Sequence, residues 1–159
     1  MIQSMTELSA DQITFKRTSG LRANSLAALV MLILEFGLGV IVNLYAEIPK
    51  TDHGLTFITA LIAAIVNGPI SLAIHAILGT LLLITAAICI VRAARTRIAN
   101  IVVFSIIGLI AILAAWGSGT GFIGTGDDGA SLTMGLATAV AILSYTLVLF
   151  FVPPTRQDR

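Results

Sequence analysis

The chain has 159 residues, of which 57% are apolar and only 11% are charged, whereas soluble domains are about 45 to 50% apolar and about 25% charged. A soluble globular domain needs more charged residues than this to cover its surface. The composition therefore indicates an integral membrane protein. Nine basic and eight acidic residues give a net charge of +1, which excludes the strongly basic surface of a nucleic-acid-binding protein. The single cysteine, Cys89, excludes an internal disulfide.

Four apolar segments are long enough to cross a hydrocarbon core about 30 Å thick. No cleaved signal peptide is expected, because a mixed polar segment precedes a first apolar run much longer than the core of about 7 to 15 residues in such peptides. Pro69 suits a first helical turn, whereas Pro153 and Pro154 end the last segment. The predicted fold is therefore all-α, an up-and-down bundle of four transmembrane helices at residues 21–46, 69–91, 98–116 and 132–152.

The distribution of basic residues predicts the orientation of these helices, because short cytoplasmic segments retain Lys and Arg. Eight of the nine basic residues fall on one side of the predicted membrane and only Lys50 falls on the other. We therefore expect a cytoplasmic N-terminal segment at 1–20, one transmembrane domain at 21–152 and a cytoplasmic tail at 153–159. The plasma membrane is the expected location. The eight residues are Lys16, Arg17, Arg22, Arg92, Arg95, Arg97, Arg156 and Arg159.

Two outer loops follow from this topology. The first, 47–68, contains a 12-residue apolar stretch at 55–66, which is too short to span the membrane and predicts an interfacial helix capping the bundle. The second, 117–130, contains six glycines together with Asp127 and Asp128. We expect it to be a flexible connecting loop, because it lacks the lysine of a P-loop and the spaced carboxylates of an EF-hand.

Three polar side chains inside the spans are the candidates for function, because burying such groups in a bilayer costs free energy. Glu35 lies about 16 Å and His75 about 9 Å from the outer ends of their helices. Glu35, Gly39 and Asn43 share one helix face, which we expect to point inward. Glu35 is predicted either to take up and release a proton or to join helices through hydrogen bonds.

His75 has three open interpretations. Its imidazole is suited to binding haem iron, with His53 of the outer loop or a second copy of His75 as the other ligand. It is also suited to contacting a proton or substrate, and a membrane histidine more often makes an interhelical hydrogen bond, here with Asn43 or Thr138. We predict a polar pocket in the outer half of the bundle, formed by Asn43 and His75 with Glu35 below and roofed by the loop that carries His53.

Several short motifs resemble a family of small four-helix bacterial membrane proteins without an established activity. The resemblance covers roughly residues 21–150 and implies the same four-helix fold and topology. The family pattern has Gln where this chain has Glu35. The matching motifs are Leu-Arg-Ala-Asn at 21–24, Phe-Gly-Leu-Gly at 36–39, Asn-Leu-Tyr at 43–45, Ile-Pro at 48–49, Gly-Pro at 68–69 and His-Ala-Ile-Leu-Gly at 75–79.

A central glutamate in the first of four helices is also similar to the small multidrug resistance transporters. In that family the resemblance implies a carboxyl that couples proton and cation binding. Those chains are shorter and have tight loops, so the long first outer loop of this chain departs from them.

These observations lead to one main functional hypothesis and two alternatives. The main one is a membrane-embedded binding or accessory protein that holds haem b or a quinone-like ligand and serves a respiratory or redox partner. The alternatives are a proton-coupled transporter that uses Glu35, and a purely structural subunit. No motif of a hydrolase, a thiol oxidoreductase, a zinc protease or a dinucleotide-binding enzyme occurs, which favours a non-enzyme. The expected partners are the lipid bilayer and either further copies of the chain or a larger membrane complex.

Overall fold

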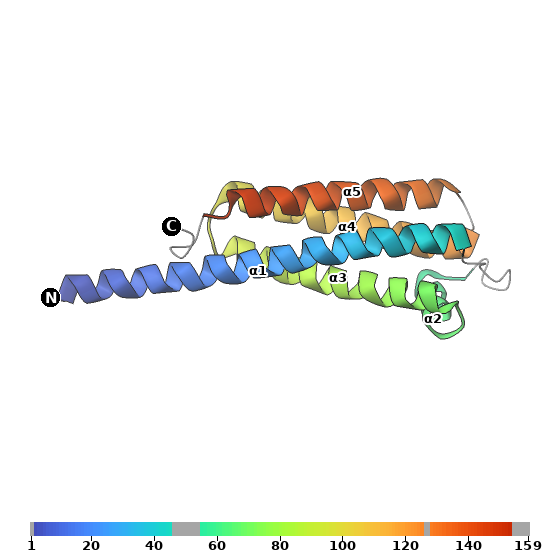
Figure 1. Ribbon diagram of the computed structural model, residues 1–159, viewed down its shortest axis with the longest axis horizontal. Coiled ribbons are helices and arrows are strands. Elements are labelled where there is room, and N and C mark those ends of the chain that lie inside the picture. The colour runs from blue at the N-terminus through green and yellow to red at the C-terminus, as the bar shows by residue number, and fades with distance from the viewer. Residues whose placement is uncertain (1, 46–54, 126–127, 154–159) are drawn as a thin grey trace.

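The computed structural model describes residues 2–45, 55–125 and 128–153, and these residues form helices joined by short turns (Figure 1). The element bounds are α1 (Ile2–Tyr45), α2 (Phe57–Val66), α3 (Ile70–Ala94), α4 (Ala99–Thr125) and α5 (Asp128–Phe151). Four helices contain segments long and apolar enough to cross a membrane: Thr18–Tyr45, Ile70–Ala94, Ala99–Ile123 and Gly129–Phe151. The prediction of an all-α protein with four candidate membrane spans is therefore confirmed.

The largest difference from the prediction concerns the glycine-rich segment after Trp116. We expected the third span to end there and a flexible loop to follow, but α4 continues through this segment to Thr125. The Thr120 hydroxyl donates a 2.8 Å hydrogen bond to the Gly117 carbonyl, within the helix. Glycine disfavours helix only weakly, and helix–helix packing overrides that preference, as the close approach of Gly119 to Met134 on α5 illustrates.

Two other features are the start of α1, which differs from the prediction, and the short helix α2, which agrees with it. α1 begins at Ile2, so the mixed polar segment before the first span is helical. The apolar stretch at 55–66 contains α2, a short helix as predicted, which lies at one end of the bundle (Figure 1). This end is called the α2 end below.

The four long helices pack in the cyclic order α1, α3, α4, α5. α1 contacts α3 and α5, and α4 contacts the same two helices, while α2 rests on α3 and α4. α3 and α5 therefore form opposite sides of the bundle (Figure 1). The outer surface is rich in exposed Leu, Ile, Val and Phe side chains, as a bilayer-facing surface requires.

The end of the bundle away from α2 is closely packed. The fully buried Tyr145 ring lies against Gly108, where an added Cβ atom would be only 2.8 Å from Cε2. Arg92 on α3 donates a hydrogen bond to the Gly20 carbonyl of α1 and so joins these two helices. Small residues that allow helices to approach closely are typical of membrane bundles, in which packing replaces the hydrophobic effect between helices.

Candidate functional site: a cavity within the helix bundle

A cavity of about 230 Å³ lies between the four long helices and reaches toward the α2 end. Its deep end is closed by Leu32, Leu82 and Ile112, which also belong to the central apolar core. Most of its lining is apolar, and the polar lining residues come from all four long helices. They are Glu35, Asn43, His75, Trp116, Thr120, Ser131 and Thr138.

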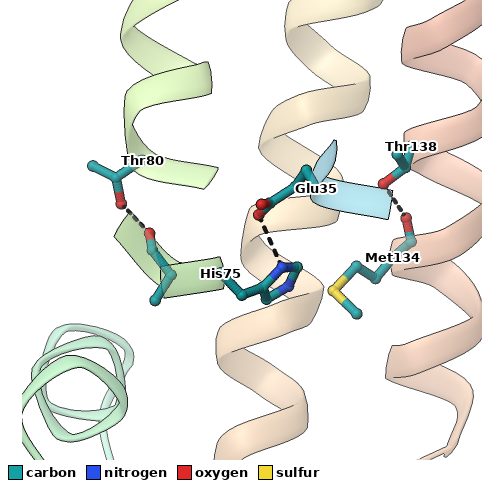
Figure 2. A network of polar contacts seen from close by, with 6 residues as sticks. Glu35, His75, Thr80, Met134 and Thr138 are labelled. Atoms are coloured by element: carbon teal, nitrogen blue, oxygen red, sulfur yellow. Dashed lines mark hydrogen bonds and ion pairs between the residues drawn. The ribbon is translucent and has the colours of Figure 1, made fainter. Parts of the chain in front are cut away.

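Glu35 and His75 meet inside this cavity. Figure 2 shows the Glu35 carboxylate of α1 pointing toward the imidazole of His75 on α3, and the distance from Oε1 to Nδ1 is 3.1 Å. Both side chains are largely buried, with 11% of Glu35 and 14% of His75 accessible. The two residues predicted to share a pocket are therefore in direct contact.

Two glycines make this contact sterically accessible. A Cβ atom at Gly79 would lie 2.8 Å from Oε1 of Glu35, and one at Gly39 would lie 3.3 Å from Cε1 of His75. Glu35 thus packs against Gly79 on the neighbouring antiparallel helix, while His75 packs against Gly39. Each polar residue precedes its own helix's glycine by four residues, about one turn. The side chains of Glu35 and His75 therefore meet although the two residues lie one turn apart in depth.

The pair leaves polar atoms available for further interactions. The contact has the distance of an ion pair, but neither Nδ1 of His75 nor Oε2 of Glu35 makes a well-directed hydrogen bond, and both atoms are buried. Buried polar atoms in proteins normally have a hydrogen-bond partner. The arrangement is therefore suited to holding a proton or the polar group of a ligand.

A second polar contact lies nearer the α2 end. The Ser131 hydroxyl of α5 donates a 3.0 Å hydrogen bond to Oδ1 of Asn43 on α1, and both residues line the cavity. The Thr138 hydroxyl donates instead to the Met134 carbonyl of its own helix, at 2.8 Å. The carboxylate of Glu35, rather than Asn43 or Thr138, is the polar group that lies beside Nδ1 of His75.

The cavity also reaches the side of the bundle. Phe36, Val40 and Leu44 of α1 line it although they are 49%, 45% and 65% exposed. On the facing helix α5, Gly135 lines the same cavity, and an added Cβ atom there would meet nothing within 4 Å. An apolar opening between α1 and α5 therefore connects the cavity with the surface that faces lipid.

The cavity contains several residues that the sequence-based prediction of the pocket omitted. His53 lies outside the described residues. Trp116, at the end of the predicted third span, lines the cavity, as does Met134, which nothing in the sequence indicated. The usable signal was the repeated spacing of a polar residue and a glycine four positions later, at Glu35 and at His75.

Among the described residues, no group of three or more His, Cys, Asp or Glu side chains is placed to hold a metal ion. Comparison of the chain with protein-family models, with curated proteins and with solved structures found no match. The function must therefore be argued from the chemistry of the cavity itself.

Proposed function

We propose that the protein is a multi-pass membrane binding protein that holds a lipid-soluble, quinone-like ligand in this cavity. The observation that carries the proposal is the buried Glu35–His75 pair at a mostly apolar cavity that opens toward lipid. Ligand sites are typically apolar clefts with a few convergent polar groups that fix the ligand's orientation.

A quinone head group matches these features chemically. Its carbonyl oxygens accept hydrogen bonds, which an imidazole N–H donates, and its flat ring suits an apolar lining with glycines. Reduction of a quinone takes up protons, and Glu35 beside His75 is suited to supplying one. An apolar tail fits the opening between α1 and α5, where Phe36 and Val40 face outward. A respiratory or redox enzyme is the corresponding partner.

Haem b fits the cavity less well. A volume of about 230 Å³ is below the range of roughly 300 to 1,000 Å³ that accommodates drug-sized ligands, and a porphyrin is larger than most of these. His75 offers one imidazole ligand among the described residues. A quinone head requires only the space beside His75, since its tail can remain in the membrane.

In the proposed topology the protein lies in the plasma membrane, both termini are in the cytoplasm, and α2 lies at the membrane surface that faces away from the cytoplasm. The support is the presence of eight of the nine basic residues on the side opposite α2. In this topology the cavity opens in the outer half of the bilayer. Reporter fusions at the C-terminus and in the segment before α2 test it, and a C-terminal fusion that is active only outside the cytoplasm would contradict it.

The ligand proposal can be tested with the protein's own fluorescence. Trp116 is the only tryptophan of the chain and lines the cavity. Titration of the purified protein with a short-chain benzoquinone should therefore quench its fluorescence in a saturable manner. Replacement of His75 by Ala should abolish saturation, because the hydrogen bond to the carbonyl is lost. Linear, unsaturable quenching of the natural protein would refute the proposal.

Two glycines provide a matched pair of variants for the same titration. Both Gly135 and Gly37 have open space beside them, but only Gly135 lines the cavity. Gly135→Leu should fill the opening and weaken quinone binding, whereas Gly37→Leu should leave it unchanged. Equal affinities in the two variants would show that the quinone binds elsewhere.

A proton-coupled transporter is the second candidate. Leu32, Leu82 and Ile112 close the deep end of the cavity. A transporter that is open to one side only has the same arrangement, which favours this candidate. Proton flux into liposomes that depends on an added cation and disappears in Glu35→Gln would support it. A protein that neither binds quinone nor moves protons would be left with the third role, a structural subunit.

A further inference from the structure

The methionine that faces His75 across the cavity suggests a second use of this site. Figure 2 shows the Met134 thioether of α5 turned toward the imidazole of His75 on α3, and both residues line the cavity. His75 is five residues from Ile70 and Met134 is five residues from Gly129, where their spans begin. Both therefore lie about 7.5 Å along their helices from the α2 end.

The other helices hold these two side chains in place. His75 packs against Gly39 of α1, and a Cβ atom at Gly119 of α4 would lie 3.4 Å from Sδ of Met134. Each potential ligand thus rests on a glycine of an intervening helix. The imidazole and the thioether converge on the same space from opposite sides of the bundle.

The imidazole of His75 has a carboxylate beside one of its two ring nitrogens. Nδ1 faces the Glu35 carboxylate at 3.1 Å, which leaves Nε2 as the nitrogen able to bind a ligand in the cavity. Histidines that bind metals through one ring nitrogen commonly present the other to a carboxylate, which fixes the tautomer and makes the ligand more basic. The Glu35 carboxylate is near enough to Nδ1 for this role, although the two groups make no well-directed hydrogen bond.

We propose that Nε2 of His75 and Sδ of Met134 bind a monovalent copper ion. Thioether sulfur is a soft ligand that selects Cu(I), and imidazole also suits copper. Zinc is disfavoured, because its sites use thiolate, imidazole and carboxylate groups with four ligands, and the described residues offer no cluster of that kind. An apolar cavity suits an ion of low charge better than a divalent one.

The copper proposal does not rest on the quinone proposal, although both ligands would use Nε2 of His75. Copper and a quinone should therefore compete for the cavity. Replacement of Met134 removes a copper ligand, whereas a larger side chain at Gly135 narrows the opening through which the quinone enters. The two proposals can consequently fail separately.

The test is an anaerobic titration of the full-length purified protein with Cu(I), in competition with a chromogenic Cu(I) chelator. The natural protein should bind one copper ion per chain, and Met134→Leu should weaken binding on the order of tenfold or more, since even the loss of an outer partner of a ligand costs about 10- to 100-fold. Met31→Leu is the matched control, because Met31 packs against the central core outside the cavity. Leucine replaces methionine with little change in volume, so both variants should fold.

Two further readouts make the outcome unambiguous. X-ray absorption of the copper-loaded protein should show sulfur and nitrogen neighbours, with the sulfur lost in Met134→Leu. Far-ultraviolet circular dichroism of Met134→Leu should match that of the natural protein, which shows that the variant is folded. Copper binding that is absent, that is equal in the two methionine variants, or that zinc matches in affinity would overturn the proposal.

Discussion

Replacing both members of the Glu35–His75 pair by leucine should restore the stability that either single replacement removes. The two side chains are 11% and 14% accessible and 3.1 Å apart. Glu35→Leu leaves a buried imidazole without the carboxylate, and His75→Leu leaves a buried carboxylate without the imidazole. Removing one partner of a buried ion pair costs about 3 to 5 kcal/mol, whereas the loss for a neutral hydrogen-bonded group is about 1 to 3 kcal/mol. The single variants therefore also report whether the pair is charged.

The double variant Glu35→Leu/His75→Leu removes both polar groups and adds apolar contacts in the cavity. Replacing a buried ion pair by apolar residues of similar volume is often neutral or stabilising by about 1 to 4 kcal/mol. We therefore expect a free energy of unfolding equal to or above that of the natural protein, together with complete loss of ligand binding.

Equilibrium unfolding in mixed micelles with sodium dodecyl sulfate, followed by circular dichroism, measures all four members of this cycle. Thr146→Leu is a suitable control, since Thr146 is exposed on the outer surface of α5. Single replacements that each cost less than about 1 kcal/mol and add up in the double variant would refute the coupling. Such a result would mean that the two side chains do not meet in the membrane.

Three further predictions concern packing. Gly108→Ala should lower the free energy of unfolding by about 1 to 3 kcal/mol, because the added methyl group would lie 2.8 Å from the rigid Tyr145 ring. Gly117 has open space beside it, so Gly117→Ala should leave stability unchanged. Equal unfolding midpoints for the two variants would contradict this prediction. Arg97 has φ of 59° in the turn between α3 and α4, so Arg97→Gly should raise the unfolding free energy by about 0.5 to 1 kcal/mol, and a lower midpoint would contradict the assignment of strain. Cys89 is fully buried, so a membrane-permeant maleimide should label it only at the rate at which the bundle opens, and rapid labelling of the folded protein would be inconsistent with this packing.

The four spans could be predicted from sequence because about twenty consecutive apolar residues are sufficient evidence for a membrane helix. The helix ends could not. The end of α4 was misplaced by nine residues, from Trp116 to Thr125, because glycine content was taken as a sign of a loop. In a bundle those glycines serve close helix packing instead, as at Gly119, and packing is not visible in a single sequence.

The site could be predicted in depth but not in rotation. Counting residues from the span ends places Glu35 about one turn deeper than His75. The structure keeps that offset: Glu35 packs against Gly79, one turn deeper than His75 on α3, and His75 packs against Gly39, one turn nearer the α2 end than Glu35 on α1. The contact itself depends on both side chains facing inward. Apolar residues surround all four helices, so hydrophobic periodicity gives no rotational phase. The Met134 thioether was missed for the same reason.

The distribution of packing explains how the bundle can hold an open cavity. Gly39, Gly79 and Gly119 hold the polar groups of the cavity, and each absent methyl group removes contacts that a filled core would have made. At the opposite end Tyr145 and its neighbours fill the interior closely. The stability lost at the α2 end must therefore be offset by the closely packed end that contains Tyr145.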